Sequence, residues 1–199
     1  MTTLNAKTAN SILPCQPINR GFSLLELLIT LSIIAILTVI ATPSFTTQSS
    51  NNEAKAVIQT LSSLVRTARN HAIYHQKSTI MCPSSDGQTC SQNWREGALI
   101  FQDNNHDKLL NTTEPVVRFN AHLSDKGSLN WTALRNYLVF SGQGLSGSSA
   151  GSFIYCPTNN NAKHAHALII SFSGKVRQAQ DTNQDGIRES GNTKNIICS

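Results

Sequence analysis

The chain has 199 residues, of which 14% are charged, and its formal net charge is +5. So low a charge content, with abundant Ser, Thr and Asn, is more typical of an exported surface protein than of a cytosolic enzyme. The net charge is too small to predict nucleic-acid binding by itself. The length allows one domain with a hydrophobic core, together with a tail and one apolar segment.

The N-terminal region contains a polar leader followed by a long apolar stretch. Residues 1–20 are polar and include Pro14 and Pro17, and we interpret residues 1–21 as a leader peptide that takes no part in the fold. From Phe22 to Ala41 the chain is almost wholly apolar, and Glu26 is its only ionisable residue. About 20 helical residues can cross the hydrocarbon of one bilayer. Residues 22–42 are therefore predicted to form a single transmembrane helix.

The order of these features differs from that of a secretory signal. A secretory signal has its cleavage site after the apolar segment, whereas Arg20 and Gly21 precede this one. Cleavage at Gly21 therefore leaves the apolar helix on the mature protein. A charge inside a membrane costs about 2.5 kcal/mol or more on insertion scales, which favours a functional role for Glu26. The alternative is a tolerated glutamate near the interface of a plain signal anchor.

Gly21, Phe22, Glu26 and Pro43 stand where type IV prepilins have the same residues, and the stretch resembles their class III signal. The resemblance implies that a prepilin peptidase cleaves after Gly21 and methylates the new N-terminus at Phe22. It also implies that Glu26 aids docking with other pilins, paired with the ammonium of Phe22 on a neighbouring subunit or on its own chain. Loss of the leader lowers the formal charge to +3, because Lys7 and Arg20 leave with it.

The helical pattern resumes after Pro43. Apolar residues recur at three- and four-residue spacing, with Lys55, Arg66 and Arg69 among the polar positions. We therefore predict that residues 43–76 form the amphipathic second half of the same helix, bent near Pro43. The residues of its apolar face are Ala54, Val57, Ile58, Leu61, Leu64, Val65, Ala68, Ala72 and Ile73.

From Lys77 onward, short β-prone runs alternate with turn residues. The predicted strands are residues 78–82, 97–102, 116–119, 136–140, 152–156, 167–172, 175–178 and 195–198. No second long helix is indicated, so residues 77–199 are predicted to be a β-rich globular head. The expected fold class is α+β, with a long N-terminal helix packed on antiparallel sheets, as in type IV pilins.

Within the pilins, the residues of the predicted head resemble those of one group, the FimT/GspH minor pilins and pseudopilins. The matching residues are 82–87 with Cys90 and Trp94, 97–107, 140–147, 167–170 and 173–177. The resemblance implies a minor type IV pilin, held in the inner membrane with a periplasmic head and then packed into the pilus or its tip complex. A type II secretion pseudopilin and a purely structural subunit that primes pilus assembly remain alternatives.

Gly174-Lys175-Val176-Arg177 carries the most specific functional expectation. In FimT proteins implicated in natural transformation, a Gly-Arg-x-Arg element near the C-terminus contributes to DNA binding. The resemblance therefore implies sequence-independent binding of double-stranded DNA through Lys175 and Arg177, although lysine loses bidentate geometry. Strand alternation puts both on one face, and Arg188 and Lys194 would widen the patch. Three acidic residues in that tail favour the alternative of a solvated turn.

The cysteines predict two disulfides. Cys15 leaves with the leader, and an even number remains in a part of the chain outside the inner membrane. Of the three pairings we favour Cys82–Cys90, which closes a short loop, and Cys156–Cys198, which ties the C-terminus to an inner strand. A metal site is less favoured, because no C-x-x-C occurs and the spacings are irregular.

Other motifs lack the structural context that their chemistry needs. Residues 142–147 fit G-x-G-x-x-G and residues 147–151 fit G-x-S-x-G, but a loop and a strand follow where a helix is required. The pairs His71/His75 and His164/His166 are predicted to be solvent-facing or hydrogen-bonded rather than metal ligands. We therefore predict no cofactor, no metal, no catalytic residue and no enzymatic activity.

Two stretches imitate the start of a calcium loop, residues 181–186 and residues 103–107. An EF-hand loop needs a glutamate at its twelfth position, where the first stretch has Asn192 and the second has Glu114. The second stretch has Lys108 instead of the glycine at position six, and neither is flanked by two helices. Turns closed by Asp and Asn side chains explain both without metal, and calcium is the alternative.

Overall fold

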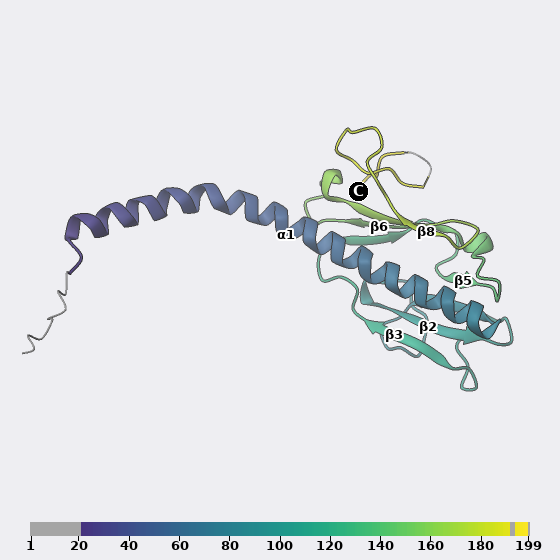
Figure 1. The fold of residues 1–199 in the computed structure, drawn as a ribbon. Helices are drawn as coiled ribbons and strands as arrows, with labels where there is room; N and C mark the ends of the chain where they lie inside the picture. The colour runs from purple at the N-terminus through teal and green to yellow at the C-terminus, as the bar shows by residue number, and fades with distance from the viewer. Residues whose placement is uncertain (1–20, 192–193, 199) are drawn as a thin grey trace, which may run out of the picture. The chain divides into compact units, whose positions relative to one another are not determined.

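The computed structural model describes residues 21–191 and 194–198, and for residues 39–47 it describes the backbone only. The predicted leader up to residue 20 lies outside the described residues. The chain divides into two compact units, Met1–Pro43 and Ser44–Ser199. One helix, α1 (Leu24–His75), contributes to both (Figure 1).

The first unit is described from Gly21 and consists of the beginning of α1. The Ser23 hydroxyl accepts a hydrogen bond from the Glu26 N–H at 3.2 Å and caps the helix. The hydroxyls of Thr30, Ser32 and Thr38 donate to carbonyl oxygens three residues earlier, at 2.8 to 2.9 Å. These polar side chains are thus satisfied within the helix and need no water.

In the second unit α1 ends in a left-handed turn. Gln76 has a φ of 53°, and the N–H groups of Gln76 and Lys77 donate to the carbonyls of Ile73 and Ala72. This is the arrangement of a Schellman motif, which satisfies the last carbonyls of a helix. Of the predicted apolar face only Ile73 is wrong, because its side chain is 44% exposed while the other eight are buried.

Two four-stranded antiparallel sheets complete the second unit. The first has the order β3 (Val116–Ala121), β2 (Gly97–Asp103), β1 (Ser78–Pro83) and β5 (Leu138–Phe140). The second has the order β4 (Ser128–Trp131), β6 (Gly151–Cys156), β7 (His166–Ile170) and β8 (Val176–Gln178). Three 3-10 turns lie between strands, η1 (Trp94–Glu96), η2 (Gly147–Ser149) and η3 (Ala162–His164). The α+β class with a helix on antiparallel sheets is confirmed.

The main core lies between α1 and the two sheets. Alternate residues of the strands, such as Met81 in β1 and Leu168 in β7, pack against the buried side chains of α1. Figure 1 shows the second half of α1 lying along strands of both sheets. Trp94 packs edge-on against Phe153, with ring centroids 4.7 Å apart, and its Nε1 donates to Asn136.

The opposite faces of both sheets are also covered. Leu110, Tyr137 and Val139 pack on the buried residues Leu99 and Phe101 of the first sheet. On the second sheet, the buried Ile196 of the C-terminal segment joins a cluster of small and aliphatic side chains. Strands buried on both faces read as nearly continuous apolar runs, which is why most of them were predicted correctly.

One strand prediction was wrong, and one strand was missed. Residues 195–198 form no strand, and only a single bridge joins Asn195 to Glu189, because the segment runs over the second sheet rather than along its edge. Strand β4 was not predicted, because Ser-Leu-Asn-Trp has low β propensity, and its pairing with β6 determines its conformation.

Candidate assembly and binding surfaces

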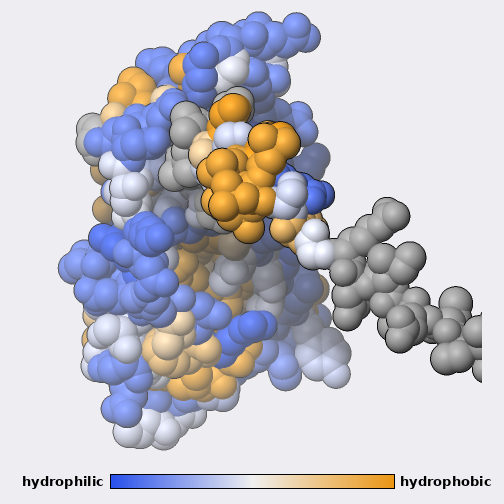
Figure 2. Space-filling model, turned by 90° about the vertical axis from the view of Figure 1, so that its left-hand side faces the viewer, coloured by the Kyte–Doolittle hydropathy of each residue, from blue (hydrophilic) through white to orange (hydrophobic). Residues whose placement is uncertain are grey.

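The beginning of α1 exposes an unusual amount of apolar surface. Eleven large hydrophobic side chains between residues 22 and 37 are each 50% to 78% exposed. Figure 2 shows exposed apolar side chains, in orange, gathered in one compact group. A surface of this kind marks contact with a membrane or with other proteins. The residues are Phe22, Leu24, Leu25, Leu27, Leu28, Ile29, Leu31, Ile33, Ile34, Ile36 and Leu37.

No helix in the described part of the chain meets the combined length and hydropathy that a membrane crossing requires. The last residues of the predicted span, 39–42, belong to the stretch described by its backbone only. The predicted bend near Pro43 lies in that stretch as well and stays a prediction.

The predicted processing site lies just ahead of the helix. Gly21, Phe22 and Ser23 have no regular secondary structure, and the Phe22 side chain is 78% exposed. Glu26 is exposed in the first turn of α1, and its carboxylate has no hydrogen-bond or ion-pair partner among the described residues. The peptide bond between Gly21 and Phe22 therefore lies outside the helix, between two exposed residues.

Lys175 lies beside two arginines of α1. The loop from Ser171 to Lys175 is closed by the Ser171 hydroxyl, which accepts the Lys175 N–H at 3.1 Å. Lys175, Arg66, Arg69 and Asn70 line one hollow with a volume of about 260 Å³. Lys175 and Arg66 are exposed, and their side chains make no ion pair or hydrogen bond within the described residues. The hollow therefore has a strongly positive wall.

Arg69 has a structural task in the same place. Its Nε donates to the Gly144 carbonyl at 3.0 Å, and its Nη2 donates to the Ser173 carbonyl at 3.4 Å. The guanidinium thus holds two loops, residues 141–147 and 171–175, against α1. The glycine-rich loop that imitates nucleotide and nucleophile motifs is part of this junction, and Ser149 beside it is buried, with its hydroxyl bonded to main-chain groups.

The other predicted DNA-binding residues lie elsewhere. Arg177 is exposed in β8 and lines a different hollow with Thr132 and Ser190. Arg188 donates to the carbonyls of Lys163 and Ala165, at 3.3 and 3.2 Å, and Lys194 is exposed. Lys175 precedes the first residue of β8, so strand alternation does not bring it beside Arg177.

The neighbourhood of Lys175 with Arg66 and Arg69 was not predicted. All three were visible as cations, but Lys175 is far in the sequence from the two arginines of α1. Their meeting depends on a close approach of two loops, in which the Gly174 Cα lies against the Gly144 carbonyl. In the sequence, the only sign of this close backbone contact is a glycine at each of the two positions.

The head contains the two disulfides that the sequence favoured, Cys82–Cys90 and Cys156–Cys198, each with its Cα atoms 5.7 Å apart. The first closes a loop in which Asp86 accepts hydrogen bonds from the N–H groups of Thr89 and Gln88 and from the Ser84 hydroxyl. These bonds, that from Thr89 first, lower the pKa of Asp86 well below its usual value. Asp86 therefore stays ionised at pH values below the ordinary pKa of an aspartate and continues to accept these bonds.

The histidine pairs have protein partners. The His71 and His75 rings lie 4.2 Å apart, and His71 Nδ1 is 3.2 Å from the Thr79 hydroxyl. Burial lowers the pKa of His71, and the neighbouring His75 lowers it further. His166 is buried and contacts Asn51 of α1, whereas His164 belongs to η3 and not to a strand.

Comparison with known proteins places the chain in a family. Residues 57–174 match the family described as type II transport protein GspH, and residues 17–42 match the prokaryotic N-terminal methylation motif. Since the first match covers more than half of the chain, the protein belongs to the GspH family of type IV minor pilins and pseudopilins. Comparison with curated proteins found no match.

Two solved structures are similar to the chain. The type IV minor pilin FimU of Pseudomonas aeruginosa strain PAO1 is 15% identical, with a TM-score of 0.50 over 65% of this chain and 90% of that chain. The minor pseudopilin EpsH of the type 2 secretion system of Vibrio cholerae is 12% identical, with a TM-score of 0.47 over 63% of this chain and 95% of that chain. The likeness to FimU shows that the fold is shared.

Proposed function

We propose that this minor pilin is incorporated into a type IV pilus or its tip complex, and that its head binds double-stranded DNA during natural transformation. The precursor is held in the inner membrane with its head in the periplasm. Prepilin peptidase cleaves it between Gly21 and Phe22 and methylates the new N-terminus. The match of residues 17–42 to the methylation motif supports this step.

Assembly uses the exposed apolar helix. Eleven large side chains that are open to solvent in the single chain become covered when α1 packs among the helices of other major and minor pilins. In the membrane, lipid already surrounds these side chains, so their packing among other helices is driven by close van der Waals contact rather than by removal from water. Glu26, which has no partner among the described residues, pairs with the N-terminal ammonium of Phe22 on a neighbouring subunit.

DNA binding is proposed for the positive hollow of the head. The observation that carries this proposal is the meeting of Lys175, Arg66 and Arg69 around one hollow, with two of the three cations free of partners in the described residues. Lysine and arginine side chains neutralise phosphates and release counterions, which gives sequence-independent affinity. The proposed contacts are therefore centred on Lys175 and Arg66, and Arg177, Arg188 and Lys194 have secondary roles.

Electrophoretic mobility shifts of the full chain in mild detergent, with a duplex of arbitrary sequence, test this proposal. Three phosphate contacts give a logarithmic salt slope near −2.7, so affinity should fall about 40-fold between 50 and 200 mM salt. Lys175→Ala or Arg66→Ala should each reduce the slope by about 1, and the double variant should remove most binding. Lys126→Ala, at an exposed lysine in other hollows, is the matched control.

Three results would redirect the proposal. Unchanged DNA binding by the Arg66→Ala/Lys175→Ala variant would reject the hollow as the site. Absence of binding by the unaltered protein, with loss of piliation on deletion, would favour a purely structural priming subunit. Exoprotein trapped in the periplasm on deletion would favour a role as a type II secretion pseudopilin, which the description of the matched family also allows.

A further inference from the structure

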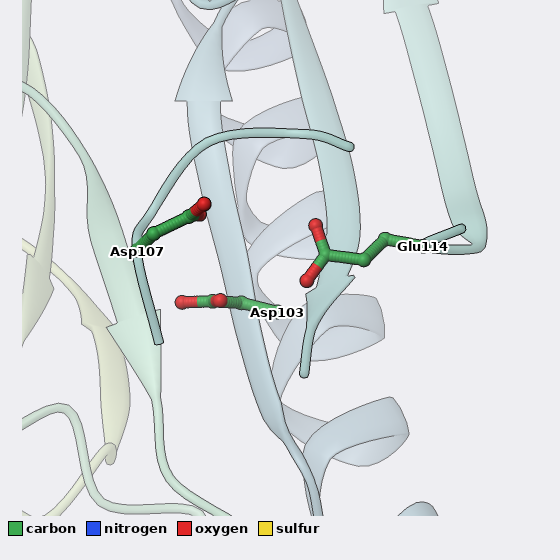
Figure 3. A group of neighbouring side chains, drawn as sticks. All are labelled: Asp103, Asp107 and Glu114. Carbon is green, nitrogen blue, oxygen red and sulfur yellow. The ribbon is translucent and has the colours of Figure 1, made fainter. Parts of the chain in front are cut away.

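Three carboxylates converge where β2 leads into β3. Asp103 is the last residue of β2, Asp107 lies in the following loop, and Glu114 precedes β3. One oxygen of each lies within 4.8 Å of the others. Figure 3 shows the three carboxyl groups directed into a common space from different sides. Within the described ranges, this is the only group of three or more acidic, histidine or cysteine side chains so arranged.

The central carboxylate is buried without a partner. Asp103 is 2% exposed, and its Oδ1 has no hydrogen-bond donor in the part of the chain that the structure describes. The ion pair among those residues joins His122 to Asp125, and neither belongs to the cluster. The Lys108 ammonium donates its hydrogen bond to the His106 carbonyl and not to Asp103. A buried carboxylate without a compensating donor or cation is costly. Asp103 Oδ1 is therefore available to accept a donor or to bind a cation.

The other two carboxylates are held in position by the loop. Glu114 is 7% exposed and accepts the N–H groups of Asn104 and Asn111, at 2.7 and 3.1 Å. Asp107 accepts the Leu109 N–H at 2.8 Å and the Asn111 side-chain amide at 2.9 Å. A carboxylate has about four lone-pair positions, so each group keeps acceptor capacity for a further partner.

The similar loop at residues 181–189 differs in this respect. Asp181 accepts the N–H groups of Gln184 and Gly186, and Glu189 accepts those of Thr182 and Asn183. Asp185 is likewise bonded to its own loop and is exposed. None of its described carboxylates is buried with an oxygen that lacks a donor. Two stretches that share the pattern Asp-x-Asn-x-Asp thus differ in whether their acidic groups are already satisfied.

We propose that Asp103, Asp107 and Glu114 bind a calcium ion. Calcium takes six to eight oxygen ligands in flexible geometry, whereas magnesium demands a near-ideal octahedron and gives up water reluctantly. Three carboxylates from one strand and its following loop suit the first better. The lysine at position six does not prevent the loop from closing, because Lys108 adopts a φ of 65°, the conformation usually supplied by glycine.

This assignment replaces the expectation of no metal from the sequence. Its structural consequence concerns residues 104–115, whose Leu110 helps to cover the outer face of the first sheet. A cation that joins the end of β2 to Asp107 and Glu114 would fasten both ends of that segment. The site is separate from the proposed DNA-binding hollow, and none of its residues lines it.

Calcium binding by the full chain in mild detergent tests the proposal. After treatment with a chelator and its removal, equilibrium dialysis against radioactive calcium should show one ion bound per chain. Saturating calcium should raise the midpoint of thermal unfolding by several degrees. Asp103→Asn should weaken binding roughly tenfold or more by removing one ligand charge, and its unfolding midpoint should no longer respond to calcium. Asp185→Asn, in the similar loop, should behave as the unaltered protein does.

The unfolding midpoint without metal gives an independent readout. Asp103→Asn removes an unpaired buried charge, so the metal-free variant should unfold at a higher temperature than the metal-free unaltered protein. If Asp103→Asn does not fold, Glu114→Gln and the binding stoichiometry of the unaltered chain decide the matter. No calcium binding by the unaltered chain, or equal binding by both cluster variants, would overturn the site. Equal or tighter binding of magnesium would overturn the assignment to calcium.

Discussion

His166 Nε2 lies 2.9 Å from Asn51 Oδ1, so the first residue of β7 is joined to α1 by a buried polar contact. The ring is only 6% exposed. Burial, with smaller contributions from the positive charges of Arg188 and Lys55, lowers the pKa of His166 to about 4. The folded head therefore contains the neutral imidazole.

The first prediction concerns pH. The pKa of His166 is lower in the folded chain than its ordinary value of 6.5, so between these values the unfolded chain binds more protons. Stability is full above about pH 7 and falls as the pH decreases toward 4, by up to about 3 kcal/mol. Thermal or denaturant unfolding over this range should show the fall, and His166→Gln should flatten it. His106→Gln, at an exposed histidine that does not contribute to this lowering, should leave the fall unchanged, and an equally steep fall in His166→Gln would refute the assignment.

The second prediction concerns the junction of the two loops. Gly174 has a φ of +74°, and a Cβ atom there would lie 2.1 Å from the Gly144 carbonyl oxygen. Gly174→Ala should destabilise the head by roughly 2 to 4 kcal/mol, because it combines left-handed strain with a backbone clash. Gly191→Ala is the matched control, since its Cβ would meet nothing nearer than 3.4 Å. Similar unfolding midpoints for both variants would show that the two loops can move apart at Gly174 without loss of stability.

The third prediction compares the two disulfides. Cys156–Cys198 spans 42 residues of sequence and Cys82–Cys90 spans 8. Because loop-closure entropy grows with length, Cys156→Ser/Cys198→Ser should cost about 4 kcal/mol and Cys82→Ser/Cys90→Ser about 2.5 kcal/mol. Unfolding under non-reducing conditions measures both. The reverse order would mean that the hydrogen-bonded loop around Asp86 depends on its disulfide for more than chain entropy.

The fourth prediction concerns assembly. Glu26→Gln keeps the size of the side chain but removes the charge proposed to pair with a neighbouring N-terminus. The amount of the protein in sheared pili should fall severalfold while its level in the membrane fraction stays the same. Thr30→Ala removes only a hydroxyl bonded to its own helix and should assemble normally. Normal incorporation of Glu26→Gln would refute the pairing.

The sequence predicted best those features that follow from a local period. The apolar spacing from Ala54 to Ala72 anticipated the buried face of α1, because one side of a long helix must face the core. Dense β-branched and aromatic runs anticipated most strands. Strand β4 has no such run, and it exists because Leu129 and its neighbours pair with β6.

The candidate site was harder to predict than the fold. Lys175 was expected to act with Arg177, because alternation along a strand is a local rule. The chain turns at Gly174, however, and β8 begins only at Val176. The meeting of Lys175 with Arg66 depends on a contact between distant segments that no local period encodes. The same holds for Asp103, whose burial depends on the loop that folds over the sheet.

The proposed processing at Gly21 is the step on which assembly, and with it DNA uptake at a pilus, depends. The most direct measurement is the N-terminal sequence and intact mass of the protein from its own cells. We predict a chain that begins at Phe22 and carries one additional methyl group, and a precursor that retains its leader when prepilin peptidase is absent. A mature chain that begins at any other residue, or an uncleaved chain in cells that contain the peptidase, would contradict the account.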